Sequence, residues 1–398
     1  MSSRDKDPGG VADVGLLSPV SAGTTAETLT GDKAIVAAML RAEVALVRAL
    51  VKTGIAPTEV EAAAERLEAV ELDPRELAVA ATESGNPVVP LVKLLRGQVD
   101  PEHAQWVHFG ATSQDVIDTA LMVVASAVAV QIEADLGRLG ATLARIADEQ
   151  RAVPMVARTL TQQAMPTTLG MRASGWLAGV HDAVRVVRTC TTLPVSLGGP
   201  VGTAAAYGAE GPAVLDAFAD ALGQRAPVSS WHTRRTPMVG LATALTIAGA
   251  ACGKIAADIL VMSQTEIGEA REGTGGRSSA MAHKSNPAQS VLVTAAARQL
   301  PALGAIIGAS AVAEQERAAG GWQAEWQPIR TMLRASAGAV ERTADLMADL
   351  VFDHDAMRRN LDQLTTTIGE DQGWVDAQIE HVGVWIDRVL GQHNEVFA

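Results

Sequence analysis

One loop, residues 273–287, gathers side chains that can act on an anion. Its polar members include Ser278, Ser279, Lys284 and Asn286, after a glycine-rich start and before a proline. Glycines open backbone conformations that other residues avoid, so N–H groups can converge on a negative charge. Long apolar helical patterns flank the loop, and we therefore predict a lid over an anionic ligand. A flexible linker is the alternative, but a linker does not require Lys284, Asn286 and proline in this order.

A second candidate stretch, residues 106–115, precedes a very long helical pattern. Thr112 and Ser113 stand at the predicted helix start, where free N–H groups and the helix dipole favour an anion. The alternative is that both residues only cap the helix. The sequence leaves both interpretations open.

Two further stretches are weaker signals on their own. Residues 157–170 are dense in Thr and Gln, which can donate neutral hydrogen bonds to carboxylates but also populate ordinary turns. Residues 314–326 combine charged and indole side chains between two core helices. This segment is either a functional face or a solvated turn whose tryptophans pack on the bundle.

The elements that position these stretches are predicted to be helices. Hydrophobic residues make up 48% of the 398-residue chain and aromatic residues only 3%, which favours helix over sheet. Apolar residues recur at steps of three and four from Leu121 to Ile146, which indicates a bundle helix. Other predicted helices cover 32–53, 58–71, 74–84, 237–264, a segment after 287 that is kinked at Pro301, 328–350, and two short helices after 353.

This pattern predicts three parts of the chain. Residues 1–111 would form an N-terminal helical domain, 112–350 a central long-helix bundle with the lid at 268–287, and 351–398 a short C-terminal helical segment.

Charge and composition exclude several classes of partner. A formal charge of −13 argues against nucleic acid and anionic membranes, although a local cationic pocket can still bind a small anion. The most apolar run, 237–253, is shorter than the ~20 residues that span a bilayer, so we expect a buried helix. Cys190 and Cys252 fit a reducing cytoplasm. No metal-ligand spacing or nucleotide-binding fingerprint appears, so we expect neither metal nor cofactor.

The loop resembles the signature loop of the fumarase/aspartase superfamily, which reads Gly-Ser-Ser-x-Met-Pro-x-Lys-x-Asn-Pro. Here residues 277–287 read Arg-Ser-Ser-Ala-Met-Ala-His-Lys-Ser-Asn-Pro. Two more superfamily blocks follow the expected order, Thr-Ser-Gln-Asp at 112–115 and Thr-Leu-Thr-Gln-Gln-Ala-Met-Pro-Thr-Thr-Leu-Gly at 159–170. Residues 108–115, 197–203 and 315–326 look most like the 3-carboxy-cis,cis-muconate cycloisomerase branch.

The resemblance implies an all-α, three-domain fold with a long central bundle and a homotetramer whose active sites are shared between subunits. It also implies conversion of 3-carboxy-cis,cis-muconate, a small tricarboxylate, to a carboxymuconolactone in the protocatechuate branch of the β-ketoadipate pathway. One substrate carboxylate closes a γ-lactone while carbon receives a proton. Neither a redox cofactor nor a metal is implied.

The resemblance also assigns roles to residues. Ser278 is implied as the proton-transfer residue, with Lys284 supplying positive charge and His108 acting as an acid or an orienting group. The substrate-binding residues implied are Thr112, Ser113, Gln114, Thr159, Gln162, Ser279, Met281, Asn286 and Arg317.

Three positions depart from the superfamily pattern. Ala282 replaces a proline and Arg277 a glycine in the loop, and both changes bear on lid closure. Position 160 is leucine, where fumarases and the argininosuccinate and adenylosuccinate lyases carry a histidine used as general acid. Leu160 thus favours the cycloisomerase branch over the alternative, a fumarate-releasing lyase. A non-catalytic protein on this scaffold is a further alternative, which the intact Ser278, Lys284 and Asn286 disfavour.

Overall fold

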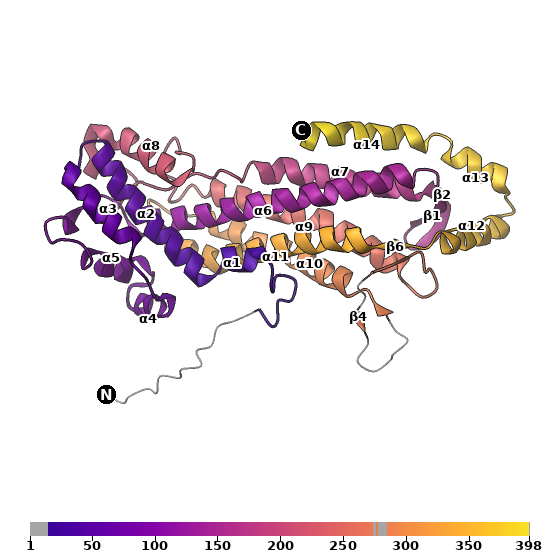
Figure 1. Ribbon diagram of the computed structural model, residues 1–398, viewed down its shortest axis with the longest axis horizontal. Helices are drawn as coiled ribbons and strands as arrows, with labels where there is room; N and C mark the ends of the chain where they lie inside the picture. The colour runs from indigo at the N-terminus through magenta and orange to yellow at the C-terminus, as the bar shows by residue number, and fades with distance from the viewer. Residues whose placement is uncertain (1–14, 274–275, 278–284, 398) are drawn as a thin grey trace, which may run out of the picture.

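The computed structural model describes residues 15–273, 276–277 and 285–397. Long helices run side by side along an elongated molecule, and shorter helices gather at its two ends (Figure 1). The long helices are α6 (Ser113–Glu149), α7 (Leu169–Arg188), α9 (Thr236–Met262), α10 (Ala288–Ser310) and α11 (Gly321–Asp349). The predicted all-α class is confirmed.

The N-terminal end is built from short helices and from α2, which leads into the bundle. They are α1 (Thr25–Leu29), α2 (Asp32–Lys52), α3 (Glu61–Glu68), α4 (Pro74–Ser84), α5 (Val88–Arg96) and, later in the chain, α8 (Gly211–Leu222). Single 3₁₀ turns occupy Thr58–Val60 and Ala104–Trp106, and a longer one Ala205–Glu210. Helix α2 packs on both α6 and α8, which ties this end to the bundle.

The centre of the core is α6, because apolar side chains recur on it at helical spacing. Ile132, Leu136, Leu139 and Leu143 are fully buried, and α6 packs against α7 and α11. Helix α10 packs against α9 and α11. Gly249 and Gly253 lie where α9 and α10 approach, and a Cβ on Gly253 would come within 2.6 Å of Ala297 Cβ.

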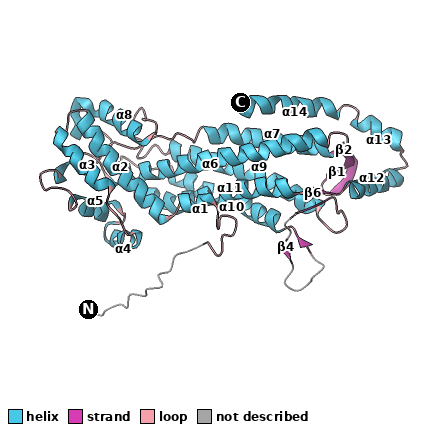
Figure 2. Ribbon diagram, in the orientation of Figure 1, coloured by secondary structure: helices cyan, strands magenta, loops and turns pink. Residues whose placement is uncertain are grey.

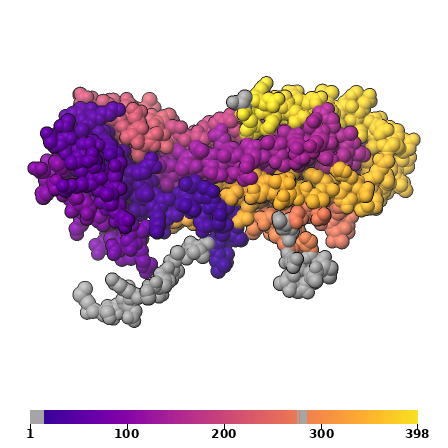
Figure 3. All heavy atoms as spheres, viewed as in Figure 1, coloured from indigo at the N-terminus to yellow at the C-terminus, as the bar shows by residue number. Residues whose placement is uncertain are grey.

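The strands are few and short (Figure 2). Strands β1 (Pro154–Thr159) and β2 (Gln162–Thr168) form an antiparallel hairpin. Strand β3 (Ala270–Arg271) pairs with β6 (Val351–Phe352), and β4 (Gly276–Arg277) with β5 (Ser285–Asn286). The C-terminal segment adds α12 (His354–Ile368), α13 (Gln372–Ile379) and α14 (Val382–Phe397), and α14 lies along α7 (Figures 1 and 3).

Several local predictions differ from the structure. The hairpin was not predicted, because its two-residue turn is Leu160-Thr161 and contains no glycine or asparagine. Helix α11 begins at Gly321 and runs through Pro328, so Trp322 and Trp326 are helical. The tail holds three helices rather than two. The predicted domain boundaries fall beside the start of α6 and the end of α11, and they stay predictions.

Three helices, α6, α9 and α10, are long and apolar enough to cross a membrane by length and composition alone. The apolar run 237–253 is only part of α9, which extends to Met262 much as the predicted helix 237–264 does, so the length of that run does not argue against a membrane span. Inside the protein, 83% of the most apolar window of α6 is buried, against 44% for α9 and 22% for α10. Helices α9 and α10 therefore keep apolar surface that the described residues of this chain do not cover.

Candidate functional site

Several of the predicted site residues meet where α6 begins. The Thr112 backbone N–H donates to Asp115 Oδ2 at 3.0 Å, which caps the helix. Arg317, from the segment between α10 and α11, donates to Thr112 Oγ1 at 2.9 Å and to the Pro200 carbonyl at 3.0 Å. We call His108, Thr112, Ser113 and Arg317 the α6-start cluster. Thr112 does cap α6, and the same residue is joined to a guanidinium beside the helix N-terminus, an arrangement suited to a carboxylate.

Asp115 joins the start of α6 to the loop at 196–199, although it was not selected from the sequence. Its carboxylate accepts hydrogen bonds from His232 Nε2 at 2.6 Å, Ser196 Oγ at 3.2 Å and the backbone N–H groups of Gly198, Gly199 and Thr112 at 2.8, 2.9 and 3.0 Å. Gly199 has φ +69°, and a Cβ there would lie 2.6 Å from the Gly110 carbonyl. Glycine is therefore needed for the loop that carries Pro200 to approach the loop before α6.

His108 lies on that loop in a left-handed conformation, with φ 62°. Its Nδ1 lies 2.7 Å from Glu43 Oε1 on α2. Burial alone would lower the pKa of His108, but the charge and hydrogen bond of Glu43, together with the charge of Asp115, outweigh it and raise the pKa above the ordinary value of 6.5. The arrangement thus favours a cationic imidazole beside Thr112.

Gln114, predicted to bind substrate, is fully buried. Its Nε2 donates to the His232 carbonyl at 2.8 Å and to Asp118 Oδ2 at 3.2 Å. Both amide protons therefore have partners inside the protein. Its substrate-binding role remains a prediction, and its donors are already used.

Beneath the α6-start cluster lies a buried ionic network that the sequence did not reveal. Arg235 donates to both oxygens of Asp118, at 2.7 and 3.0 Å, and also to Glu325. Trp322 Nε1 donates to Asp118 at 3.0 Å. Burial would lower the pKa of Arg235, but the two carboxylates outweigh it and raise the pKa. The network joins the starts of α6, α9 and α11, and it explains why Trp322 lies inward.

Thr159 and Gln162 lie at the hairpin tip, beyond the far end of α6. They pair with each other across the two-residue turn. Both turn residues have positive φ, 50° for Leu160 and 68° for Thr161, as a type I′ turn requires. Leu160 is 95% exposed, so the described chain provides nothing for it to pack against.

Both ends of the glycine-rich loop are held by hydrogen bonds. Gly276 pairs with Asn286, and Glu272 accepts hydrogen bonds from the Gln289 and Ser290 backbone N–H groups at 3.0 and 2.9 Å, which caps α10. Asn286 thus lies at the end of the loop, just before α10. Ser278, Ser279, Met281 and Lys284 lie outside the described residues.

The predicted residues therefore fall into three separate groups within one chain. Helix α6 has 37 residues, which at ~1.5 Å per residue separates the α6-start cluster from the hairpin tip by about 55 Å. Helix α10 has 23 residues, which at the same rise sets Asn286 about 35 Å from the end that leads to Arg317. These groups cannot contact one small ligand within a single chain.

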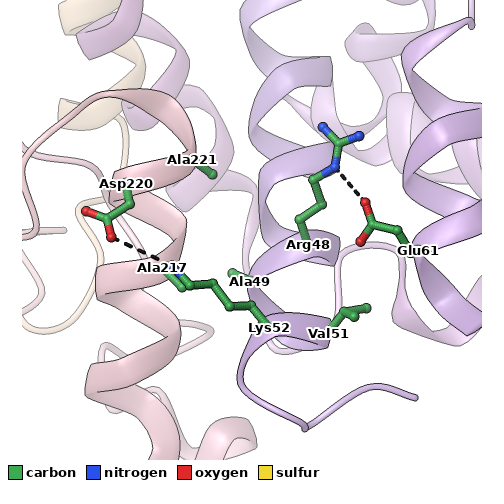
Figure 4. Close-up of a pocket in the computed structure, with 8 residues that line it drawn as sticks. All are labelled: Arg48, Ala49, Val51, Lys52, Glu61, Ala217, Asp220 and Ala221. Carbon is green, nitrogen blue, oxygen red and sulfur yellow. Dashed lines mark hydrogen bonds and ion pairs between the residues drawn. The ribbon is translucent and has the colours of Figure 1, made fainter. Parts of the chain in front are cut away.

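One surface cleft lies elsewhere, between α2 and α8, with a volume of about 500 Å³ (Figure 4). Its cations are already paired, Arg48 with Glu61 at 2.9 Å and Lys52 with Asp220 at 3.9 Å. It contains none of the predicted site residues. Within residues 15–273, 276–277 and 285–397, no cluster of three or more His, Cys, Asp or Glu is arranged to hold a metal ion.

Comparison with known proteins gives consistent matches. A family model described as Lyase matches residues 18–302. A nitrosuccinate lyase of Streptomyces davaonensis is 44% identical over 368 residues, 88% of this chain and 78% of that protein. A 3-carboxy-cis,cis-muconate cycloisomerase of Bradyrhizobium diazoefficiens is 38% identical over 356 residues, 87% of this chain and 79% of that protein.

Two solved structures are also similar to this chain over most of its length. The 3-carboxy-cis,cis-muconate lactonizing enzyme of Pseudomonas putida superposes with a TM-score of 0.86 at 29% identity, covering 96% of this chain and 100% of that one. A fumarate lyase of Mesorhizobium sp. BNC1 gives a TM-score of 0.78 at 25% identity, covering 93% and 88%.

Proposed function

Because the chain belongs to the fumarase/aspartase superfamily and is an enzyme of that superfamily, we propose that it converts 3-carboxy-cis,cis-muconate to a γ-lactone. The observation that carries this proposal is Arg317, whose guanidinium joins Thr112 and Pro200 at the N-terminus of α6. With His108 close by, this end of the bundle supplies positive charge for a substrate with three carboxylates.

The proposed reaction is an intramolecular addition. A substrate carboxylate oxygen bonds to carbon, one C=C π bond is lost, and one proton is taken up at the carbon next to a carboxylate. Negative charge grows on that carboxylate in the transition state, so donors placed around it lower the barrier. We assign the proton transfer to Ser278 and the nearby positive charge to Lys284.

Leu160 disfavours those reactions of this superfamily in which the leaving group must be protonated. Release of an amine or of hydroxide requires an acid to protonate the leaving group, and leucine cannot supply a proton. Lactonisation has no leaving group, so it tolerates Leu160. This is the argument against adenylosuccinate and argininosuccinate as substrates.

A second candidate is elimination of nitrite from nitrosuccinate, favoured by the 44% identity to a nitrosuccinate lyase. A C–H proton is removed, the C–N bond breaks, and fumarate and nitrite form. Nitrite is a weak base and leaves without protonation, so this reaction is also compatible with Leu160. Both candidates need the same donors around a carboxylate.

We further propose that several copies of the chain build each site. The hairpin tip and Asn286 each lie about 35–55 Å from the α6-start cluster along the helices of one copy, whereas a small ligand needs all three groups within hydrogen-bond distance. The apolar surface of α9 and α10 would be covered by the same assembly, a homotetramer. Helix α9 carries Lys254, whose Nζ donates to Asp258 at 2.6 Å, and such a charge pair suits a protein or aqueous surface better than lipid.

The test is to mix the purified enzyme with each substrate in turn. Ultraviolet loss of 3-carboxy-cis,cis-muconate with lactone formation would support the proposal, and release of nitrite with fumarate from nitrosuccinate would support the second candidate. Fumarate from adenylosuccinate or argininosuccinate would contradict the argument from Leu160. Ser278→Ala should abolish turnover with little change in substrate binding, and near-normal turnover in that variant would contradict its assignment.

A further inference from the structure

Glu43 is a buried carboxylate that belongs to none of the sequence blocks discussed above. It lies on α2 within an otherwise apolar run and is 0% exposed. A buried charge is costly unless it is paired and hydrogen-bonded. A carboxylate at this position therefore calls for an explanation beyond packing.

Its partner is His108, 65 residues further along the chain. Glu43 Oε1 lies 2.7 Å from His108 Nδ1, and because a carboxylate accepts, Nδ1 carries the proton. The second oxygen, Oε2, is buried and has no hydrogen-bond partner among the described residues. The contact with Glu43 occupies His108 Nδ1, so Nε2 is the imidazole nitrogen that remains for a further hydrogen bond.

The backbone of His108 is held so that this contact forms. Its φ of 62° is unusual for a residue with a side chain. The carbonyl before it, of Val107, accepts from Arg96 Nε and Nη2 at 3.3 and 3.1 Å. The carbonyl after it, of Phe109, accepts from Tyr207 Oη at 2.9 Å. Contacts on both sides fix a strained residue, as is common where function requires one orientation.

Charges from three helices act on the imidazole. Glu43 on α2 and Asp115 on α6 raise the pKa of His108, while burial and Arg96 on α5 lower it. The net effect is an increase, and Glu43 makes the largest contribution to it. Burial is the largest single influence and acts in the opposite direction, so the loss of Glu43 should lower the pKa of His108.

We propose that Glu43 is a positioning residue for the reaction: it holds His108 as an imidazolium whose Nε2–H donates a charged hydrogen bond to a substrate carboxylate at the α6-start cluster. This role rests on the proposed function. No proton leaves His108 in the step, and its positive charge is the contribution. Glu43 itself does not touch the substrate.

The test measures the pKa of His108 directly, in protein without substrate. Histidine hydrogen–deuterium exchange read by mass spectrometry gives a separate pKa for each histidine. In the native protein His108 should titrate above 6.5. In Glu43→Gln the pKa should fall by at least about one unit, so the alkaline limb of kcat/KM should move to lower pH by the same amount, with about tenfold lower kcat/KM above both values. Glu68→Gln, an exposed carboxylate on α3, is the matched control and should leave both measurements unchanged.

An unchanged His108 pKa in Glu43→Gln would overturn the proposal. So would a lowered pKa with an unmoved alkaline limb, because the imidazolium would then not serve the reaction. If the variant does not fold, a native His108 that titrates below 6.5 overturns the pairing by itself. Failure of the proposed function would look different: the native enzyme would turn over none of the candidate substrates, while the exchange measurement would still report on the pair.

Discussion

Arg317 is the residue on which the proposed substrate binding depends most. It reaches Thr112 and Pro200 through two different nitrogens of its guanidinium. Arginine presents a planar fork that a lysine cannot reproduce. Its position between the start of α6 and the loop that carries Pro200 therefore depends on side-chain shape as well as on charge.

We predict that Arg317→Lys raises KM by about tenfold and Arg317→Gln by about 100-fold, since a hydrogen bond to a charged group contributes roughly 1.5–3 kcal/mol. Steady-state kinetics on the substrate that the native enzyme turns over would measure both values. Arg234→Gln, at an exposed arginine that bonds Thr236, is the control. If all three variants had the same KM as the native enzyme, Arg317 would not be a substrate-binding residue.

At the residue scale, the sequence could suggest roles only where a motif was visible. Thr112, Ser113 and Arg317 stood in such motifs, and the structure brings them together. Glu43 and His232 stood in none, because a lone charged residue in a helical or irregular stretch has no spacing that predicts its partner. Their contacts to His108 and Asp115 cross 65 and 117 residues, and only the fold brings such distant residues together.

Two contacts determine how the helices pack against one another. They are the ionic network under the α6-start cluster and the close approach of α9 and α10. Arg235 lies just before α9 and joins Asp118 on α6 to Glu325 on α11. All three side chains are at most 2% exposed. Removing the cation leaves two buried carboxylates without their common partner.

We therefore predict that Arg235→Leu lowers the free energy of unfolding by about 3–5 kcal/mol. Urea denaturation followed by circular dichroism would measure the loss. Lys254→Leu breaks an exposed ion pair on the same helix and should change stability by less than about 1 kcal/mol. A similar small effect for both variants would show that the network does not stabilise the fold.

The contact between α9 and α10 gives a separate prediction. Gly253→Val should destabilise the protein by about 1–3 kcal/mol, because the new side chain meets Ala297 and forces the helices apart. Gly240→Ala is the matched change on α9, where a Cβ would meet nothing within 4 Å; it should raise stability by up to about 1 kcal/mol. Thermal unfolding of the two variants side by side would decide, and equal shifts would contradict the close approach.

Helices were the easiest elements to predict, since periodic apolar residues specify which face is buried. The hairpin β1–β2 was missed because Leu160 and Thr161 take a turn that normally favours Asn-Gly. The start of α11 was misplaced because proline favours the first turn of a helix, whereas Pro328 lies inside α11. The buried contact of Trp322 stabilises the turns before it.

At the scale of the whole molecule, the separation of the three residue groups is the main finding. The sequence placed these groups in order along the chain but gave no distances between them. Those distances come from the lengths of α6 and α10, which hold the groups at different places along the bundle. The family resemblance implied shared sites, and the geometry of one chain is consistent with that proposal.

Shared sites predict recovery of activity in mixed assemblies. At a substrate concentration near the native KM, Arg317→Gln and Ser278→Ala should each have little activity alone. Co-expressed copies should regain part of it, because some sites would receive native groups from different copies. Activity of the purified mixture, with its composition checked by native mass spectrometry, is the measurement. Arg317→Gln with Thr112→Val, both in the α6-start cluster, is the control and should regain none. Mixed assemblies without recovery would place each site within one chain.

The exposed tip at Leu160 has a consequence for how such an enzyme can diversify. Its side chain packs against nothing in the described part of its own chain, and its backbone shape is set by the strand pairing on either side. A substitution there should leave the folding of its own subunit nearly unaffected, so natural variation can exchange an apolar residue for a proton donor without first acquiring compensating mutations. A new leaving-group preference could then evolve in few substitutions, with every variant along the way still folded.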